Sequence, residues 1–235
     1  WRVKAEAADR FEASDYRGAL ELYSEASLLD PRDAVPHYMM AVCYERLGFD
    51  PAQYVEHAET ALRLSPQYAP ALMLLSSVAE RNGRLDIAIG YADDAAKSPA
   101  APARAHRMRA ELELQRPAPD LALALDQFRA ARDKQDDTPG LQLRIAQTQM
   151  RLYGAMQPGR YPAHLLAALS ETARALEEAK GDGIDPVETA IARAQIEIAL
   201  EYPDRAYTLI DTALIGLPKT TDPDVRARLL VTRGR

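Results

Sequence analysis

Four histidines and one cysteine are the side chains best suited to bind a metal or act as a nucleophile. No His-x-x-x-His or Cys-x-x-Cys spacing places two ligands on one helical turn, so we expect no metal site and no cofactor. Cys43 lies beside Met39 and Met40 in an apolar stretch, which predicts a buried, unreactive thiol. The histidines are scattered, at His37, His57, His106 and His164.

Paired carboxylates could supply a general acid and a general base. Asp93 and Asp94 are adjacent, as are Glu177 and Glu178. Adjacent residues on a helix point in different directions, so these pairs predict solvated faces rather than a catalytic site. The GDGID stretch at 181–185 has too few ligands for a calcium loop and lacks the Lys and Ser/Thr of a phosphate loop, which favours a turn. We therefore expect no catalytic residues and no enzyme activity.

Composition indicates an all-α protein. Of the 235 residues 47% are apolar and 27% charged, Ala and Leu are prominent, and β-branched residues are sparse. A single cysteine excludes an intrachain disulfide. The formal net charge of −6 argues against a nucleic-acid partner, which would need a basic surface.

The termini and apolar runs bear on location. No stretch approaches the roughly 18 apolar residues of a membrane span, so we expect no membrane insertion within this segment. The chain starts at Trp1 rather than Met, which predicts a fragment of a longer chain. We predict a cytoplasmic location; the alternative is the soluble part of a membrane-anchored or envelope protein. The 24 arginines against five lysines suggest a bacterial source, and the oligomeric state is open.

A repeat of about 34 residues organises the chain. Small residues recur at steps of 34, 35, 34, 36 and 48, namely Ala7, Ala41, Ser76, Ala110, Ala146 and Ala194. A second pattern has spacings of 4, 3 and 5, first seen at Ala19, Tyr23, Ala26 and Pro31. Residues four and three apart share a helix face, and a small residue lets a partner helix approach closely. A fixed period of this length indicates stacked helical hairpins.

The repeat resembles the tetratricopeptide repeat (TPR) family over nearly the whole chain, and residues 5–48 resemble the opening repeats of co-chaperone-type members. The resemblance implies a right-handed α-solenoid of about six hairpins plus a terminal helix, as one domain over 1–235. An irregular fifth repeat covers about 139–185, with a loop near 154–163. The predicted hairpins are 2–29, 34–64, 69–97, 102–134, 139–180 and 186–217, followed by a helix at 223–233.

In this family the first helix of each hairpin lines a groove that binds a protein or peptide. The matching positions here include Lys4, Tyr38, Met73, Ser77, Arg104, Arg107, Glu111 and Gln147. Members that bind the acidic tail of heat-shock chaperones use two Lys, two Asn and an Arg. Only Lys4 matches that set, because the other positions hold Ala8, Met39, Pro70 and Leu74, so we reject chaperone-tail binding.

Charge along the chain suggests an acidic partner. Residues 101–160 carry 10 basic and 7 acidic side chains in a chain that is otherwise acidic. Arg104 and Arg107 could attract an acidic peptide; alternatively they pair with Glu111 and Glu113 as an ordinary solvated surface. We predict a non-enzymatic scaffold that binds a protein or peptide. The alternative is a regulatory or targeting arm of a multidomain enzyme such as a transferase, kinase or protease.

Overall fold

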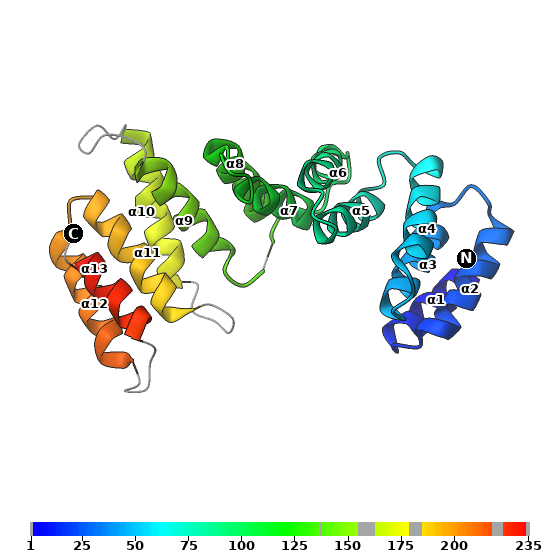
Figure 1. The fold of residues 1–235 in the computed structure, drawn as a ribbon, viewed down its shortest axis with the longest axis horizontal. Coiled ribbons are helices and arrows are strands. Elements are labelled where there is room, and N and C mark those ends of the chain that lie inside the picture. Colours follow the sequence, from blue (N-terminus) through cyan, green and yellow to red (C-terminus); the bar gives the residue numbers. More distant parts are fainter. Residues whose placement is uncertain (1, 137, 155–162, 179–184, 218–222, 234–235) are drawn as a thin grey trace. The chain divides into compact units, whose positions relative to one another are not determined.

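A computed structural model describes residues 2–136, 138–154, 163–178, 185–217 and 223–233. Within these ranges every regular element is an α-helix, as predicted (Figure 1). The helices are α1 (Arg2–Glu12), α2 (Tyr16–Leu29), α3 (Ala34–Arg46), α4 (Pro51–Leu64), α5 (Ala69–Arg81), α6 (Leu85–Lys97), α7 (Ala103–Leu114), α8 (Leu121–Asp133), α9 (Leu141–Gly154), α10 (Ala163–Glu178), α11 (Pro186–Ala199), α12 (Pro203–Gly216) and α13 (Pro223–Arg233). None of them combines the length and apolar character needed to cross a bilayer.

The chain divides into two compact units, Trp1–Ala118 with α1–α7 and Pro119–Arg235 with α8–α13. In the first unit α1 packs on α2, α3 on α4, and α5 on α6, while in the second α9 packs on α10 and α11 on α12. These are five of the six predicted hairpins. The predicted hairpin at 102–134 has one helix in each unit, so its packing, like the single domain, stays a prediction. Most of the predicted loop at 154–163 and of the GDGID turn lies outside the described residues.

The small residues of the repeat lie in the packed interior. Ala7, Ala41, Ser76, Ala110, Ala146 and Ala194 are all fully buried, which confirms the register assigned from sequence. Ser76 is the polar member of the set, and its hydroxyl donates to the Ala88 carbonyl oxygen across the α5–α6 hairpin at 2.8 Å. The buried hydroxyl is therefore satisfied, and it ties the two helices together.

The turns within the hairpins repeat as well. Ser14, Gly48, Gly83 and Glu201 each adopt a positive φ, between 62° and 75°, just after a first helix. The following backbone N–H then donates to the carbonyl five residues back, as from Phe49 to Tyr44 at 3.1 Å. This left-handed helix ending suits glycine, because other residues meet a Cβ clash there. Aspartates then cap several second helices, Asp15 and Asp50 among them.

The core of the second unit joins three helices. Leu169 and Leu176 of α10 pack with Ala146 of α9 and with Ile196 of α11. Ile196 and Leu169 are fully buried. A second cluster joins α11, α12 and α13 around Ile210. Helix α11 is therefore held from both sides within this unit.

Candidate protein-binding surface

The first helices of the first unit carry seven of the eight predicted site residues. We call these positions on α1, α3, α5 and α7 the first-helix surface; they are Lys4, Tyr38, Met73, Ser77, Arg104, Arg107 and Glu111. Met73 is buried among Ala69, Leu72 and Ala105, so its side chain packs in the core and is not available to a ligand. The eighth predicted residue, Gln147, lies on α9 in the second unit, where its side-chain amide donates to Glu188 at 3.3 Å.

Tyr38 of α3 forms an aromatic pair with Tyr68. Its ring meets the ring of Tyr68 edge to face, with centroids 5.5 Å apart and planes at 81°. Burial raises the pKa of Tyr38, whereas the positive charge of Arg104 acts to lower it. Helix α5 links the helices of these two residues, because it shares one core cluster with α3 and another with α7. In the second cluster Ala105, next to Arg104, packs with Ala69, next to Tyr68, so Arg104 comes near the tyrosine pair although it lies 66 residues from Tyr38 in the chain.

Several charges on the first-helix surface already have partners. Lys4 forms an ion pair with Asp33, the residue that caps α3. Arg107 pairs with Glu111 one turn later, at 3.2 Å. For Arg107 this matches the solvated-surface alternative considered from sequence. Arg104, by contrast, is exposed and makes no ion pair with any described residue.

Side-chain bonds also link consecutive first helices at their carboxyl ends. Arg81 of α5 donates to Glu45 of α3 at 2.9 Å and to the Tyr54 hydroxyl at 3.2 Å. Gln115, at the end of α7, donates to Glu80 of α5 at 2.6 Å. Each bond joins one repeat to the next, so α3, α5 and α7 are held as neighbours.

A buried chain of alternating charges was not predicted from sequence. Arg109 and Glu113 of α7 are 6% and 2% exposed and pair at 2.8 Å. Arg109 also reaches Asp93 of α6 at 3.4 Å, and Arg116 reaches Glu113 at 3.6 Å. The i, i+4 spacing of Arg109 and Glu113 beside the buried Ala110 was a usable signal. These contacts fix α7 against α6 and so position Arg104 and Arg107.

The cysteine and one carboxylate of each adjacent pair are buried or engaged in ion pairs. Cys43 is fully buried, and burial raises the pKa of its thiol to about 11, so the thiolate is scarce at neutral pH. Asp93 is held by Lys97 and Arg109, and Glu177 pairs with Arg193 at 3.4 Å. Among the described residues, no three His, Cys, Asp or Glu side chains gather as metal ligands.

Two of the histidines lie together between α3 and α4. The rings of His37 and His57 stack with centroids 6.1 Å apart, and His57 stacks on Tyr44 at 5.2 Å. Burial lowers the pKa of both histidines, and the charges of Arg63 near His37 and of His37 near His57 add to this. The charges of Asp33 near His37 and of Glu56 near His57 act in the opposite direction. Both imidazoles are therefore neutral in the folded state at pH 7.

This stack predicts a loss of stability in mild acid. Below the ordinary histidine pKa of about 6.5 the unfolded chain binds protons that the folded chain resists, so stability falls as pH drops towards the lower folded values. Urea denaturation at pH 7.5 and 5.5 should show a larger loss for the wild type than for His37→Gln combined with His57→Phe. Equal losses would mean that the stack does not couple folding to pH.

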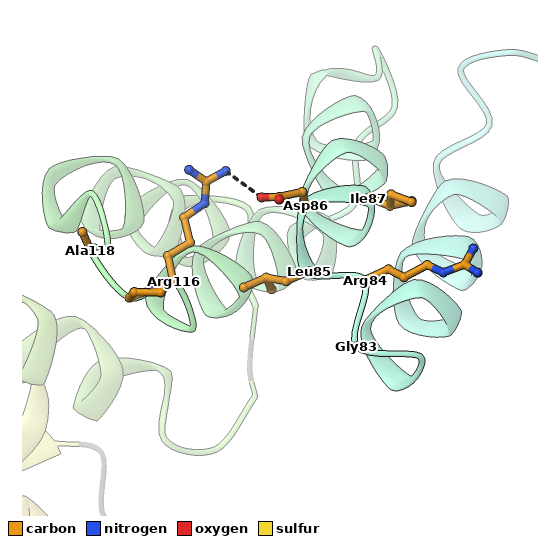
Figure 2. A pocket seen from close by; sticks show the side chains of 8 residues that line it. Gly83, Arg84, Leu85, Asp86, Ile87, Arg116 and Ala118 are labelled. Atoms are coloured by element: carbon orange, nitrogen blue, oxygen red, sulfur yellow. Dashed lines mark ion pairs between the residues drawn. The ribbon is translucent and has the colours of Figure 1, made fainter.

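An open hollow lies at the edge of the first unit. It is lined by Gly83 to Ile87, at the start of α6, and by Arg116 to Ala118, after α7. Figure 2 shows Arg116 directed at Asp86, and their charged atoms are 3.8 Å apart. Leu85 and Ile87 contribute apolar surface. The charged groups of Arg116 and Asp86 are paired with each other. The residues that line the hollow therefore do not include an acid, a base and a nucleophile that converge on one point.

Solved structures with the same arrangement of helices identify the fold. Pseudomonas aeruginosa PilF superposes with a TM-score of 0.67 at 14% identity, over 98% of this chain and 96% of PilF. The TPR protein YrrB, described as having an unusual peptide-binding site, gives 0.67 at 12% identity, over 91% of this chain and 98% of YrrB. This chain has the tetratricopeptide-repeat fold.

The same TPR fold is seen in PilW, described as a widely conserved type IV pilus biogenesis factor. Its TM-score is 0.58 at 17% identity, over 97% of this chain and 96% of PilW. The sequence matches no protein-family profile. The TPR fold implied by the resemblance of the repeat is therefore confirmed at the level of structure, at identities where sequence similarity is weak.

Proposed function

We propose that this TPR chain is a non-catalytic scaffold that binds a protein partner through its first-helix surface. The observation that supports the proposal is the packing of Tyr38 of α3 on Tyr68, together with the shared core cluster of Ala69, next to Tyr68, and Ala105, next to Arg104 on α7. Arg104 is exposed, and Tyr38 and Ser77 are partly exposed, so side chains from three consecutive repeats can contact one ligand. YrrB, which has the same fold, is described as having a peptide-binding site.

The balance of polar and apolar groups suits a protein ligand. Tyr38 and Tyr68 present large rings with a polar end, a combination that is enriched at interfaces. Neighbouring ion pairs such as Glu45–Arg81 are half-exposed and can form a polar rim. An elongated ligand would contact α3, α5 and α7 in turn, one repeat after another.

Charge reversal on α7 tests the proposal. Tagged full-length protein should retain its native partner in the wild type and lose it in Arg104→Glu combined with Arg107→Glu, and the wild-type interaction should weaken as salt rises. The matched control is Arg17→Glu with Arg63→Glu, which makes the same charge change on the second helices α2 and α4. Circular dichroism confirms folding of each variant. Equal loss in both double variants, or in neither, would contradict binding through the first-helix surface.

A further inference from the structure

The outer face of α6 differs from the outer faces of α2, α4 and α8. Gly90 lies exposed in the middle of α6, and a Cβ added there would meet no atom within 4 Å. The equivalent positions on the other three helices carry exposed charges, namely Glu21, Glu56 and Asp126. A glycine inside a helix costs stability relative to alanine, and no neighbour within the described residues requires it here. What Gly90 does provide is room for another backbone to approach closely.

Two unpaired charges of opposite sign flank Gly90. Arg84 lies just before α6 and Asp94 lies one turn after Gly90; both are exposed, and neither makes an ion pair within the described part of the chain. Ile87, between Arg84 and Gly90, is 49% exposed. Figure 2 shows Arg84 and Ile87 directed to the same side, away from Arg116. We call Arg84, Ile87, Gly90 and Asp94 the α6 stripe.

Helical spacing makes the α6 stripe complementary in charge to itself. Ile87, Gly90 and Asp94 are three and four residues apart, so they follow one face of the helix. At 1.5 Å per residue, Arg84 lies about 9 Å before Gly90 along the axis and Asp94 about 6 Å after it. When a second copy of α6 crosses antiparallel at Gly90, Arg84 of each copy lies within about 3 Å, along the axis, of Asp94 of the other.

Charge also selects the orientation of such a pair. A parallel crossing would place Arg84 beside Arg84 and Asp94 beside Asp94, and like charges repel. On the opposite flank of α6, Asp86 and Asp93 are already paired with cations of their own chain. The antiparallel crossing is therefore the one that gives both unpaired charges a partner.

We propose that this protein forms an antiparallel, two-fold symmetric dimer through the α6 stripe, with Gly90 at the crossing and Arg84 of each copy paired with Asp94 of the other. In such an isologous contact the same patch is used twice, so Ile87 of both copies is covered. One helix from each copy gives a contact at the small end of specific interfaces, below about 1,200 Å². We therefore expect a weak dimer, with a Kd of about 10–100 µM.

Sedimentation equilibrium of the full chain tests the dimer. At low salt, between about 10 and 500 µM protein, the average mass should rise from the 26.0 kDa of one chain towards twice that value, and added salt should reduce the rise. Arg84→Glu and Asp94→Arg should each weaken dimerisation by about tenfold. An equimolar mixture of these two variants should dimerise like the wild type, because both ion pairs form across the mixed pair. Arg17→Glu on α2, the matched control, should change nothing.

Glycine substitutions test the crossing point separately from the charges. Gly90→Leu should abolish the dimer yet melt no lower than the wild type, because the new side chain enters open space and leucine favours a helix. Gly216→Leu makes the same change at an exposed position of α12 where a Cβ also meets open space. This control should leave the dimer intact.

Three results would overturn the inference. The first is the mass of a single chain at every concentration, which would leave the α6 stripe to a different protein. The second is a dimer that persists in both Arg84→Glu and Gly90→Leu, since such a dimer uses another surface. The third is a mixture of the two charge variants that stays monomeric. The α6 stripe shares no residue with the first-helix surface, so neither proposal depends on the other.

Discussion

Glu113→Ala should lower the free energy of unfolding of the first unit by about 3 kcal/mol, because it leaves the guanidinium of Arg109 buried without its closest carboxylate. The loss should lie at the lower end of the range for a broken buried pair, since Asp93 remains 3.4 Å from Arg109. Urea denaturation followed by far-UV circular dichroism measures it.

The matched control is Glu111→Ala on the same helix. Glu111 pairs with Arg107, but its side chain is 39% exposed, so this change should cost less than about 1 kcal/mol. Arg109→Met combined with Glu113→Leu should be less destabilising than Glu113→Ala, because it removes both buried charges together. If Glu113→Ala and Glu111→Ala cost the same, the charge chain does not fix α7 on α6.

Ile196→Ala should destabilise the second unit by about 2–5 kcal/mol, the usual cost of truncating a large buried aliphatic side chain. Ile196 is fully buried among Leu169, Ala173 and Leu176, so the cavity would lie where α9, α10 and α11 meet. Thermal and urea unfolding of the full chain would both report it.

Ile215→Ala makes the identical chemical change on α12. Ile215 is 85% exposed, so its truncation should alter stability by no more than about 0.5 kcal/mol. A similar cost for the two isoleucines would contradict the packing described for the second unit.

The fold was predictable because its determinants are local and repeated. Close approach of two helices requires a small side chain, and Ala41, Ser76 and Ala110 therefore recur once per repeat. Prolines and left-handed turns mark the helix ends, as at Gly48 and Gly83. The outer limits predicted for the helix pairs consequently agree with the ends of the described helices to within a few residues.

The binding surface was less predictable because it depends on how the repeats stack. The repeat register gave Tyr38 and Arg104 as separate positions, but whether they share one surface depends on the stacking of α3, α5 and α7. Tyr68 was not predicted to belong to the surface, because it lies at the N-cap position just before α5 and so outside the helical register. The role of Glu113 was also hidden, since burial of a carboxylate depends on Arg109 and on side chains of α6.

Site-specific photocrosslinking tests the central claim most directly. A benzophenone amino acid would replace Ser77 or Tyr38 on the first helices α5 and α3, and Glu59 or Asp94 on the second helices α4 and α6, in cells expressing the full-length protein. The account predicts that one and the same partner is crosslinked from Ser77 and Tyr38, and that Arg104→Glu combined with Arg107→Glu abolishes the crosslink. Crosslinking only from Glu59 and Asp94, or an undiminished crosslink in the double variant, would contradict partner binding through the first-helix surface.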